Sequence, residues 1–293
     1  MTYVRPFDPW RGTSLCTCPF KYTVNPYTGC SHGCLYCYAS SYIKDFFNPR
    51  PKKNFLEQVR RDIARIPRRS IINVSSSSDP YQPLELEHGY TRRLLELLRD
   101  RYVVEIVTKS DLVTRDKDLL AGRRSLVSIT ITTLDDSLAR RLEPNAPPPS
   151  RRVKAVEELS QSGIPVVVRL DPIIPGLNDD EYSVRAVLEA VASAGAKHIV
   201  SSTYKVKPDN LRRLTEMFPE IIPRIRELYF QRGERIHGYI YAEREYRLKV
   251  MSLVKEAAER EGLTFATCRE GLSQLHTRGV NCDGTHLVLG GSP

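Results

Sequence analysis

The spacing of apolar residues changes between two periods along the chain, and the two periods predict its strands and helices. Short apolar runs rich in β-branched residues indicate buried strands, and apolar residues three and four positions apart indicate helices packed on a sheet. Strand patterns occur at residues 22–25, 70–74, 102–107, 126–131, 165–170 and 197–202. Helical patterns lie between them, at residues 54–66, 84–100, 115–122, 136–142, 150–162 and 180–194.

The strict alternation of strand and helix predicts an α/β fold. Repeated strand–helix units form parallel sheets, and right-handed crossovers curl such a sheet. Residue types indicate three helix boundaries. Asn54 and Glu57 resemble a capping box at the start of the first helix, and Gly163 and Gly195 are expected to end the helices before them.

The pattern changes at the two ends of the chain. Residues 1–21 are polar, aromatic and rich in proline, and we expect an irregular lead-in to a core of residues 22–204. Residues 205–293 predict helices at 208–217, 219–231 and 242–262, with a last strand at 265–268. Since no Gly/Ser linker separates this mainly helical part, we expect an extension packed on the core and not a second domain.

Composition narrows the class of protein. Of the 293 residues, 41% are hydrophobic, which suffices for a large core, and no apolar run is long enough for a transmembrane helix. The first residues have no apolar signal-peptide region, so we expect a cytoplasmic protein without a membrane partner. The net charge of +9 indicates either a nucleic-acid partner or an ion-paired surface rich in Arg and Glu.

Three of the seven cysteines lie close together in the stretch NPYTGCSHGCLYCY, as Cys30, Cys34 and Cys37. A strand or helix would point three such thiolates apart, so we expect a loop, for which Gly29 and Gly33 give the backbone freedom. Three local cysteines without a local fourth fit a [4Fe–4S] cluster with one open iron better than a structural zinc site. The alternatives are a zinc knuckle or a group of buried thiols.

This spacing, with Tyr36 directly before the third cysteine, resembles the radical S-adenosylmethionine (SAM) superfamily. The resemblance implies a partial (β/α)6 TIM-like barrel. It also implies that SAM binds the open iron and is cleaved by one electron to methionine and a 5′-deoxyadenosyl radical, which takes a hydrogen atom from the substrate. An electron donor such as ferredoxin or flavodoxin would be a further partner.

Polar and apolar residues at the ends of the predicted strands extend the resemblance. SSSSDPYQPLE, at residues 75–85, resembles the branch that contains spore photoproduct lyase, and PIIPGLND, at residues 172–179, supports it. In that family these strand ends bind the methionine, ribose and adenine parts of SAM. The SAM-binding residues implied here are Tyr36, Ser77, Ser78, Asp79, Lys109, Ser128, Thr130, Arg152, Ile173 and Ile174. A Ser-rich turn, a solvated lysine and a surface loop around Arg152 are the ordinary alternatives.

One departure from the lyase pattern bears on the substrate. The lyase has a cysteine just before the Ser-Asp of its second-strand motif, and this cysteine returns a hydrogen atom to the product. Here Ser76 and Ser77 occupy that place, and a serine O–H bond is too strong for the role. We therefore do not expect repair of thymine photoproducts.

Four further cysteines lie near the two ends of the chain. If the ends meet, Cys16, Cys18, Cys268 and Cys282 form a candidate second metal site for an iron–sulfur cluster or zinc. His276 and His286 are weaker alternative ligands. Four unrelated thiols are the other interpretation.

Together these features predict a radical SAM enzyme of the lyase or transferase type with SAM as its partner. Charge and kinship favour a nucleic acid, DNA or tRNA, as the substrate. One alternative is a peptide- or protein-modifying enzyme with an auxiliary metal site. The other is a non-catalytic iron–sulfur or zinc protein that binds nucleic acid.

Overall fold

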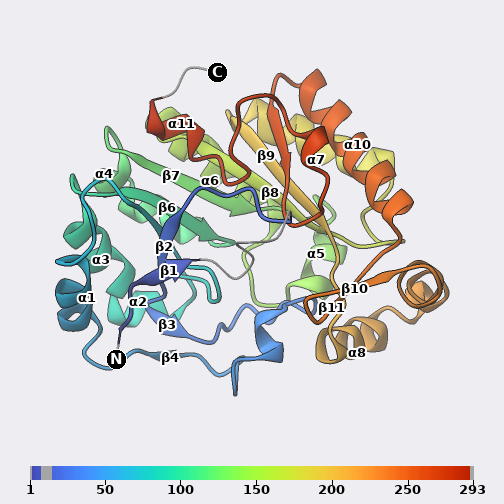
Figure 1. The fold of residues 1–293 in the computed structure, drawn as a ribbon, viewed down its shortest axis with the longest axis horizontal. Coiled ribbons are helices and arrows are strands. Elements are labelled where there is room, and N and C mark those ends of the chain that lie inside the picture. The colour runs from blue at the N-terminus through green and yellow to red at the C-terminus, as the bar shows by residue number, and fades with distance from the viewer. Residues whose placement is uncertain (1, 8–14, 291–293) are drawn as a thin grey trace.

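One curved sheet of eight strands forms the centre of the protein (Figure 1). The computed structural model describes residues 2–7 and 15–290. The order across the sheet is β1-β2-β5-β6-β7-β8-β9-β12. The strands are β1 (Arg5–Phe7), β2 (Lys21–Val24), β5 (Ile71–Val74), β6 (Val103–Thr108), β7 (Ser125–Thr130), β8 (Val166–Ile173), β9 (His198–Thr203) and β12 (Thr264–Thr267).

The six strands expected from the pattern are present, adjacent to one another in chain order, as β2, β5, β6, β7, β8 and β9. All six pair in parallel, as strand–helix alternation requires, which confirms the predicted α/β architecture. The antiparallel β1 and the parallel β12 extend the sheet at its two edges. The expected irregular lead-in was therefore partly wrong, since it contributes β1.

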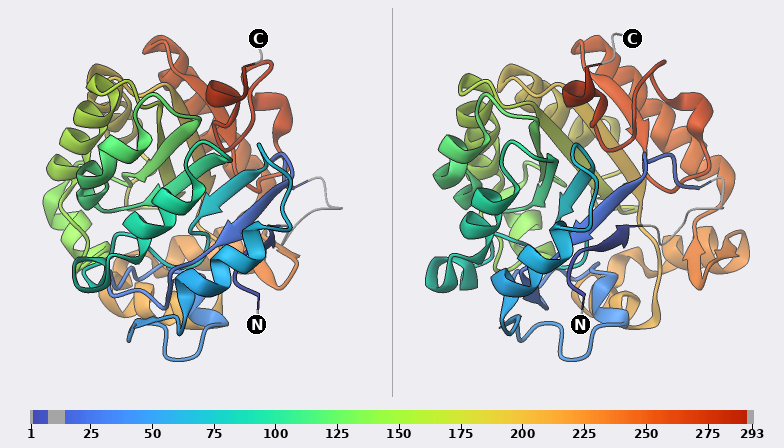
Figure 2. Two further views of the ribbon diagram at one scale, coloured as in Figure 1. Left: turned by 90° about the vertical axis from the view of Figure 1, so that its left-hand side faces the viewer. Right: turned by 60° about the vertical axis from the view of Figure 1, so that its left-hand side comes forward.

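Helices cover the outer side of the curved sheet (Figure 2). They are α1 (Phe55–Ile63), α2 (Leu84–His88), α3 (Tyr90–Leu98), α4 (Lys117–Leu120), α5 (Asp136–Leu142), α6 (Pro149–Gln161), α7 (Glu181–Ser193) and α10 (Arg244–Arg260). Strand residues such as Val166, Val168 and Ile199 are fully buried beneath them. Each such side chain contributes about 1.5–3 kcal/mol when it leaves water, so the sheet–helix interface holds the fold together.

Two local predictions were wrong. The segment 84–100 forms two helices because Gly89 adopts a left-handed conformation with φ of 59° and ends α2. Asn54 precedes α1 as expected, but it is itself left-handed, and its side chain makes no capping hydrogen bond. A left-handed residue cannot direct its side chain at the first amides of the helix as a capping residue does.

The C-terminal part differs most from its prediction. Helix α8 (Pro208–Met217) has the expected bounds, but residues 219–231 divide into a 3-10 turn (Pro219–Ile221), α9 (Ile222–Ile225) and a π-helix (Arg226–Gln231). An unpredicted hairpin of β10 (Glu234–Ile236) and β11 (Tyr239–Tyr241) follows. The remaining elements are the two-residue strands β3 (Tyr27–Thr28) and β4 (Arg50–Pro51), α11 (His286–Leu289) and 3-10 turns at Ala39–Ser41, Asp111–Asp116 and Ser273–Leu275.

The helices of residues 2–7 and 15–290 include none with the length and apolar character needed to cross a membrane.

Candidate cluster and cofactor site

A cavity of about 840 Å³ opens inside the curved sheet, and the three clustered cysteines form part of its wall. Cys30 and Cys34 are buried, Cys37 is partly buried, and all three are free thiols. Burial raises the pKa of all three thiols, that of Cys34 to about 12. At neutral pH they are protonated unless a metal provides the positive charge that favours the thiolate.

The cysteine loop folds tightly because Gly29 lets its backbone lie close to the carbonyl group of Phe46. Gly29 has φ of 84°, and a Cβ atom there would lie 2.4 Å from the carbonyl oxygen of Phe46. The same oxygen accepts a hydrogen bond from the Cys30 amide at 2.8 Å. Only glycine combines this backbone conformation with the close contact, so the loop geometry depends on it.

Side chains from distant segments hold the loop in place. The Gln82 amide donates to the Gly29 carbonyl at 3.1 Å and accepts from the Ser31 amide at 3.0 Å. From α8, Asn210 donates to the Tyr36 carbonyl at 3.2 Å and Arg213 donates to the Cys37 carbonyl at 3.3 Å. The cysteines therefore sit on a loop that is fixed from both sides.

A buried ionic network lies behind Cys34. Glu143 pairs with Arg152, with Oε2 and Nη1 2.5 Å apart, and its other oxygen accepts a hydrogen bond from the Tyr36 hydroxyl. Burial opposes ionisation of Glu143, but the charges of Arg152 and Lys109 prevail and lower its pKa. Arg152, one of the expected SAM-binding residues, therefore lies in this network beside Cys34.

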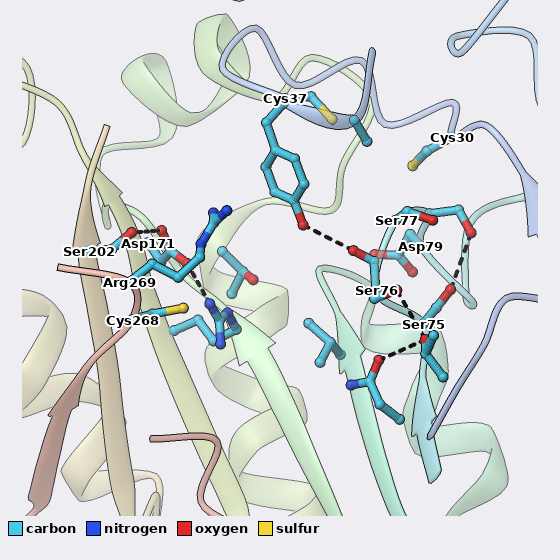
Figure 3. Close-up of a pocket in the computed structure, with 18 of the residues that line it drawn as sticks. Cys30, Cys37, Ser75, Ser76, Ser77, Asp79, Asp171, Ser202, Cys268 and Arg269 are labelled. Atoms are coloured by element: carbon cyan, nitrogen blue, oxygen red, sulfur yellow. Dashed lines mark hydrogen bonds and ion pairs between the residues drawn. The ribbon is translucent and has the colours of Figure 1, made fainter. Parts of the chain in front are cut away.

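The serine loop after β5 forms the adjoining wall (Figure 3). The side-chain oxygen of Asn25 organises it by accepting hydrogen bonds from the Ser75 hydroxyl at 2.7 Å and from the Ser76 and Ser77 amides at 3.1 Å each. Ser78 completes this wall. Asn25 was missed from the sequence because a lone Asn before a motif also fits a simple turn residue.

Asp79 and Lys109 connect the serine loop to the end of β6. The Asp79 carboxylate accepts from the Lys109 amide and the Thr108 hydroxyl, both at 2.7 Å. Burial opposes ionisation of Asp79, but the charge of His32 and these hydrogen bonds lower its pKa to about 2. The Lys109 ammonium lies 5.4 Å from the centre of the Tyr36 ring, so a cation faces the cavity beside the cysteine loop.

The structure brings some of the expected SAM-binding residues together and leaves others apart. Tyr36, Ser77, Ser78, Asp79, Lys109 and Thr130 all line the cavity. Ser128, Arg152, Ile173 and Ile174 are buried and are absent from the lining. Pro172 lines the cavity where the two isoleucines were expected.

The opposite wall carries charged residues that sequence reasoning missed (Figure 3). Arg169 pairs with Asp171, with Nη2 and Oδ2 2.5 Å apart, and the Ser202 hydroxyl donates to Asp171 Oδ1 at 2.5 Å. The Arg269 guanidinium stacks 5.1 Å from the Tyr38 ring centre. Arg169 and Asp171 share one face of β8 by strand alternation, which is the signal that the sequence contained.

The four outlying cysteines line the same cavity. The Sγ atoms of Cys18 and Cys282 lie 3.0 Å apart, although 264 positions separate them in the chain. His276 bonds to the Thr267 hydroxyl at 2.8 Å, His286 accepts from the Asn281 amide at 3.2 Å, and neither lines the cavity. In the part of the chain that the structure describes, no group of three or more Cys, His, Asp or Glu is arranged to hold a single metal ion.

Comparison with known protein families decides the class. A family model for the radical SAM superfamily matches residues 24–188. The chain belongs to the radical SAM superfamily. This membership implies a [4Fe–4S] cluster and SAM as the cofactors, and Cys30, Cys34 and Cys37 fit that cluster as three free thiols that border one cavity.

Two relatives of this radical SAM protein share only part of its sequence. An uncharacterised protein of Methanocaldococcus jannaschii is 34% identical over 169 residues, 55% of this chain and 64% of that protein. The chain thus spans just under two thirds of that relative. A protein of Pseudomonas phage M6 described as a radical SAM Nα-GlyT isomerase is 26% identical over 258 residues, 84% of this chain and 53% of that protein.

Among solved structures, spore photoproduct lyase with bound AdoMet and dinucleoside spore photoproduct has a similar fold. The TM-score is 0.66 at 17% identity, covering 84% of this chain and 75% of the lyase chain. The predicted resemblance to the lyase branch is therefore confirmed at the level of the fold.

Proposed function

We propose that this protein is a radical SAM enzyme in which Cys30, Cys34 and Cys37 hold a [4Fe–4S] cluster. The observation that supports this most is the position of these three free thiols beside Lys109 and the serine loop on one cavity wall. When bound, the cluster supplies the electron that cleaves SAM and generates the radical for hydrogen abstraction from the substrate. Free cysteines fit a reducing compartment such as the cytoplasm.

The chain's own side chains bind and orient SAM in this proposal. The Lys109 ammonium is placed for the SAM carboxylate, and the hydroxyls of Ser77 and Ser78 are placed for its amino group. Asp79 acts through Lys109, since it fixes the Lys109 backbone and keeps its own oxygens occupied. Thr130 faces the cavity and is placed for the ribose.

The expected SAM-binding residues that do not line the cavity hold its lining in place in this proposal. Arg152 donates to the Thr130 carbonyl at 3.1 Å, which holds that strand end in place. Ile173 and Ile174 lie in the core and support Pro172, while Ser128 is buried within β7. These residues shape the cavity and exclude water from it, a condition for controlling a reactive radical.

The test is SAM cleavage by anaerobically reconstituted protein with a strong reductant, measured as 5′-deoxyadenosine. Wild type is expected to form it, and Cys34→Ala is expected to lose both the cluster absorbance and the product. Lys109→Met is expected to weaken SAM binding about tenfold, whereas Lys255→Met, on α10 and paired with Glu259, is the matched control. Cleavage by Cys34→Ala at the wild-type rate would contradict the assignment.

We propose a nucleic acid, DNA or tRNA, as the substrate. Arg269 adds positive charge to the cavity wall, in which Arg169 and Lys205 are paired with acidic residues, and the net charge of the chain is +9. Tyr42 is 59% exposed beside Tyr38, with ring centres 6.3 Å apart, so aromatic faces are available to stack an unpaired base. The dinucleoside ligand in the structure of spore photoproduct lyase supports this choice.

Affinity measurements distinguish the candidate substrates. The ligands are single-stranded DNA, tRNA, a basic peptide and an acidic peptide. Affinity for a nucleic acid is expected to fall steeply with salt and to drop for Arg269→Gln. Arg185→Gln, on α7 and outside the cavity, is the control of equal charge. Peptide binding without salt-sensitive nucleic-acid binding would favour a peptide-modifying enzyme instead.

A further inference from the structure

The four cysteines outside the radical SAM motif come from opposite ends of the chain and meet in the cavity. Cys16 and Cys18 precede β2, Cys268 directly follows β12, and Cys282 lies in the next loop. All four are free thiols. Figure 3 shows Cys268 on the side of the cavity opposite Cys30 and Cys37, and the Sγ atoms of Cys18 and Cys282 lie 3.0 Å apart.

The surroundings of this group suit a negatively charged centre. Lys21 lies beside Cys18, although its ion pairs with Glu105 and Asp283 offset its charge. Arg169 hydrogen-bonds to Cys268, and Arg269 follows Cys268 in the chain and adds a second positive charge beside it. Four thiolates around a metal centre leave it with net negative charge, which needs such neighbours when it is partly buried.

The spacing and position of the cysteines distinguish an iron–sulfur cluster from structural zinc. Zinc sites use pairs with two to four residues between the ligands and surround the ion closely on all sides. Here one residue separates Cys16 from Cys18, residues 269–281 separate Cys268 from Cys282, and all four sulfurs border an open cavity. They do not converge on a single-ion position, and neither do the three cysteines of the radical SAM motif.

We propose that Cys16, Cys18, Cys268 and Cys282 bind a second iron–sulfur cluster across the cavity from the first. With four protein thiolates, this cluster has no open position for SAM or substrate, in contrast to the cluster of the radical SAM motif. It joins the segment before β2 to the segment after the edge strand β12. The proposal stands on its own cysteines and is independent of the SAM chemistry.

The decisive variant leaves the four cysteines intact. Cys30→Ala, Cys34→Ala and Cys37→Ala are combined, the protein is reconstituted without oxygen, and loosely bound iron is removed with a chelator. Iron, acid-labile sulfide and zinc are then measured per chain. We expect about two or four irons with matching sulfide, and an electron paramagnetic resonance signal after reduction.

The complementary variant combines Cys268→Ser and Cys282→Ser. This variant is expected to retain only the cluster of the radical SAM motif. The protein that carries both sets of cysteine substitutions is expected to bind no iron. Loss of all iron in the first variant would overturn the proposal, as would one zinc without sulfide. A Cys18–Cys282 disulfide in anaerobically purified protein, detected by mass, would also overturn it.

These outcomes are separable from those of the proposed function. If the first variant keeps its iron and wild type cleaves no SAM, the second cluster stands and the radical SAM activity fails. If the first variant loses its iron and wild type still forms 5′-deoxyadenosine, the reverse holds.

Discussion

Single buried polar side chains shape the cavity, and Asn25 has the widest effect. Its one carbonyl oxygen accepts from four donors of the serine loop. Asn25→Ala leaves these donors without their partner, so we expect the loop to shift and the Kd for SAM to rise about tenfold, or ~1.4 kcal/mol. Equilibrium dialysis with reconstituted protein measures this change.

The matched variant Asn25→Asp keeps an acceptor of the same shape. It should bind SAM within about threefold of wild type, because the donors of the serine loop still find a partner. Equal affinities for the Ala variant and wild type would mean that the serine loop holds its shape without Asn25.

The ion pair of Glu143 with Arg152 is the costliest interaction to break. Both side chains are about 1% exposed, so Glu143→Gln leaves an uncompensated buried guanidinium. We expect the free energy of unfolding to fall by about 3–5 kcal/mol, measured by urea denaturation of the metal-free protein. The control is Glu57→Gln, which breaks the exposed pair with Arg61 and should change stability by less than about 0.5 kcal/mol. A similar small change for Glu143→Gln would contradict the role of the network.

At the scale of elements, the cysteine loop depends on a glycine whose replacement is prevented by space as well as by conformation. Gly29→Ala would force a Cβ atom against the Phe46 carbonyl, 2.4 Å away. We expect the loop to open and iron incorporation at Cys30, Cys34 and Cys37 to fall at least tenfold. Gly163→Ala has a similar φ, 74°, but no neighbour within 4 Å, so it should cost only about 1–2 kcal/mol and retain its iron. Normal iron content in both variants would show that the loop tolerates displacement.

The contact between β9 and α11 predicts a pH dependence. His198 starts β9 and packs edge-on against His286, with ring centres 5.0 Å apart. Burial and then the charge of His286 lower the pKa of His198 from 6.5 to about 3. Between these values the unfolded chain binds a proton that the folded protein does not. Stability therefore falls with decreasing pH, by about 1.4 kcal/mol per unit below about pH 6.5.

Urea denaturation at pH 7.5 and 5.5 tests this dependence. His198→Asn is expected to lose about 1 kcal/mol less than wild type between the two values, because the unfavourable protonation is removed. The exposed His237→Asn is the control and should follow wild type. An unchanged difference in His198→Asn would place the pH dependence elsewhere.

Elements that depend on the local pattern of residues could be predicted from the sequence. Elements that form only through contact with distant segments could not. The six central strands follow from their β-branched apolar runs, and the cysteine loop from three ligands within eight residues. The edge strand β1 is three exposed or half-buried residues that become a strand only by pairing with β2. Likewise, Arg169 and Arg269 are ordinary basic residues until β8 and the segment after β12 bring them to one cavity.

For the whole molecule, the main feature is that the segment before β2 and the segment after β12 meet inside the curved sheet. Lys21 at the start of β2 pairs with Asp283 at 2.8 Å and with Glu105 at 2.6 Å, all fully enclosed. Gly284 packs directly on Val167 of β8, where a Cβ atom would lie 2.3 Å from the valine side chain. The C-terminal segment is therefore packed directly against β2 and β8.

A metal centre bound by the four outlying cysteines would link the segment before β2 to the segment after β12. Thermal unfolding tests whether this link stabilises the protein. A link between Cys18 and Cys282 spans 264 positions, and closing so long a loop in the unfolded chain is worth about 5 kcal/mol in the chain-entropy model. In the variant that lacks Cys30, Cys34 and Cys37, removal of iron should lower Tm by at least about 5 °C. With Cys268→Ser and Cys282→Ser added, iron should no longer affect Tm. The comparison of loaded with metal-free protein within each variant cancels the cost of the substitutions themselves. An equal Tm with and without iron in the first variant would mean that only the Lys21–Asp283 ion pair and apolar packing keep these two segments together.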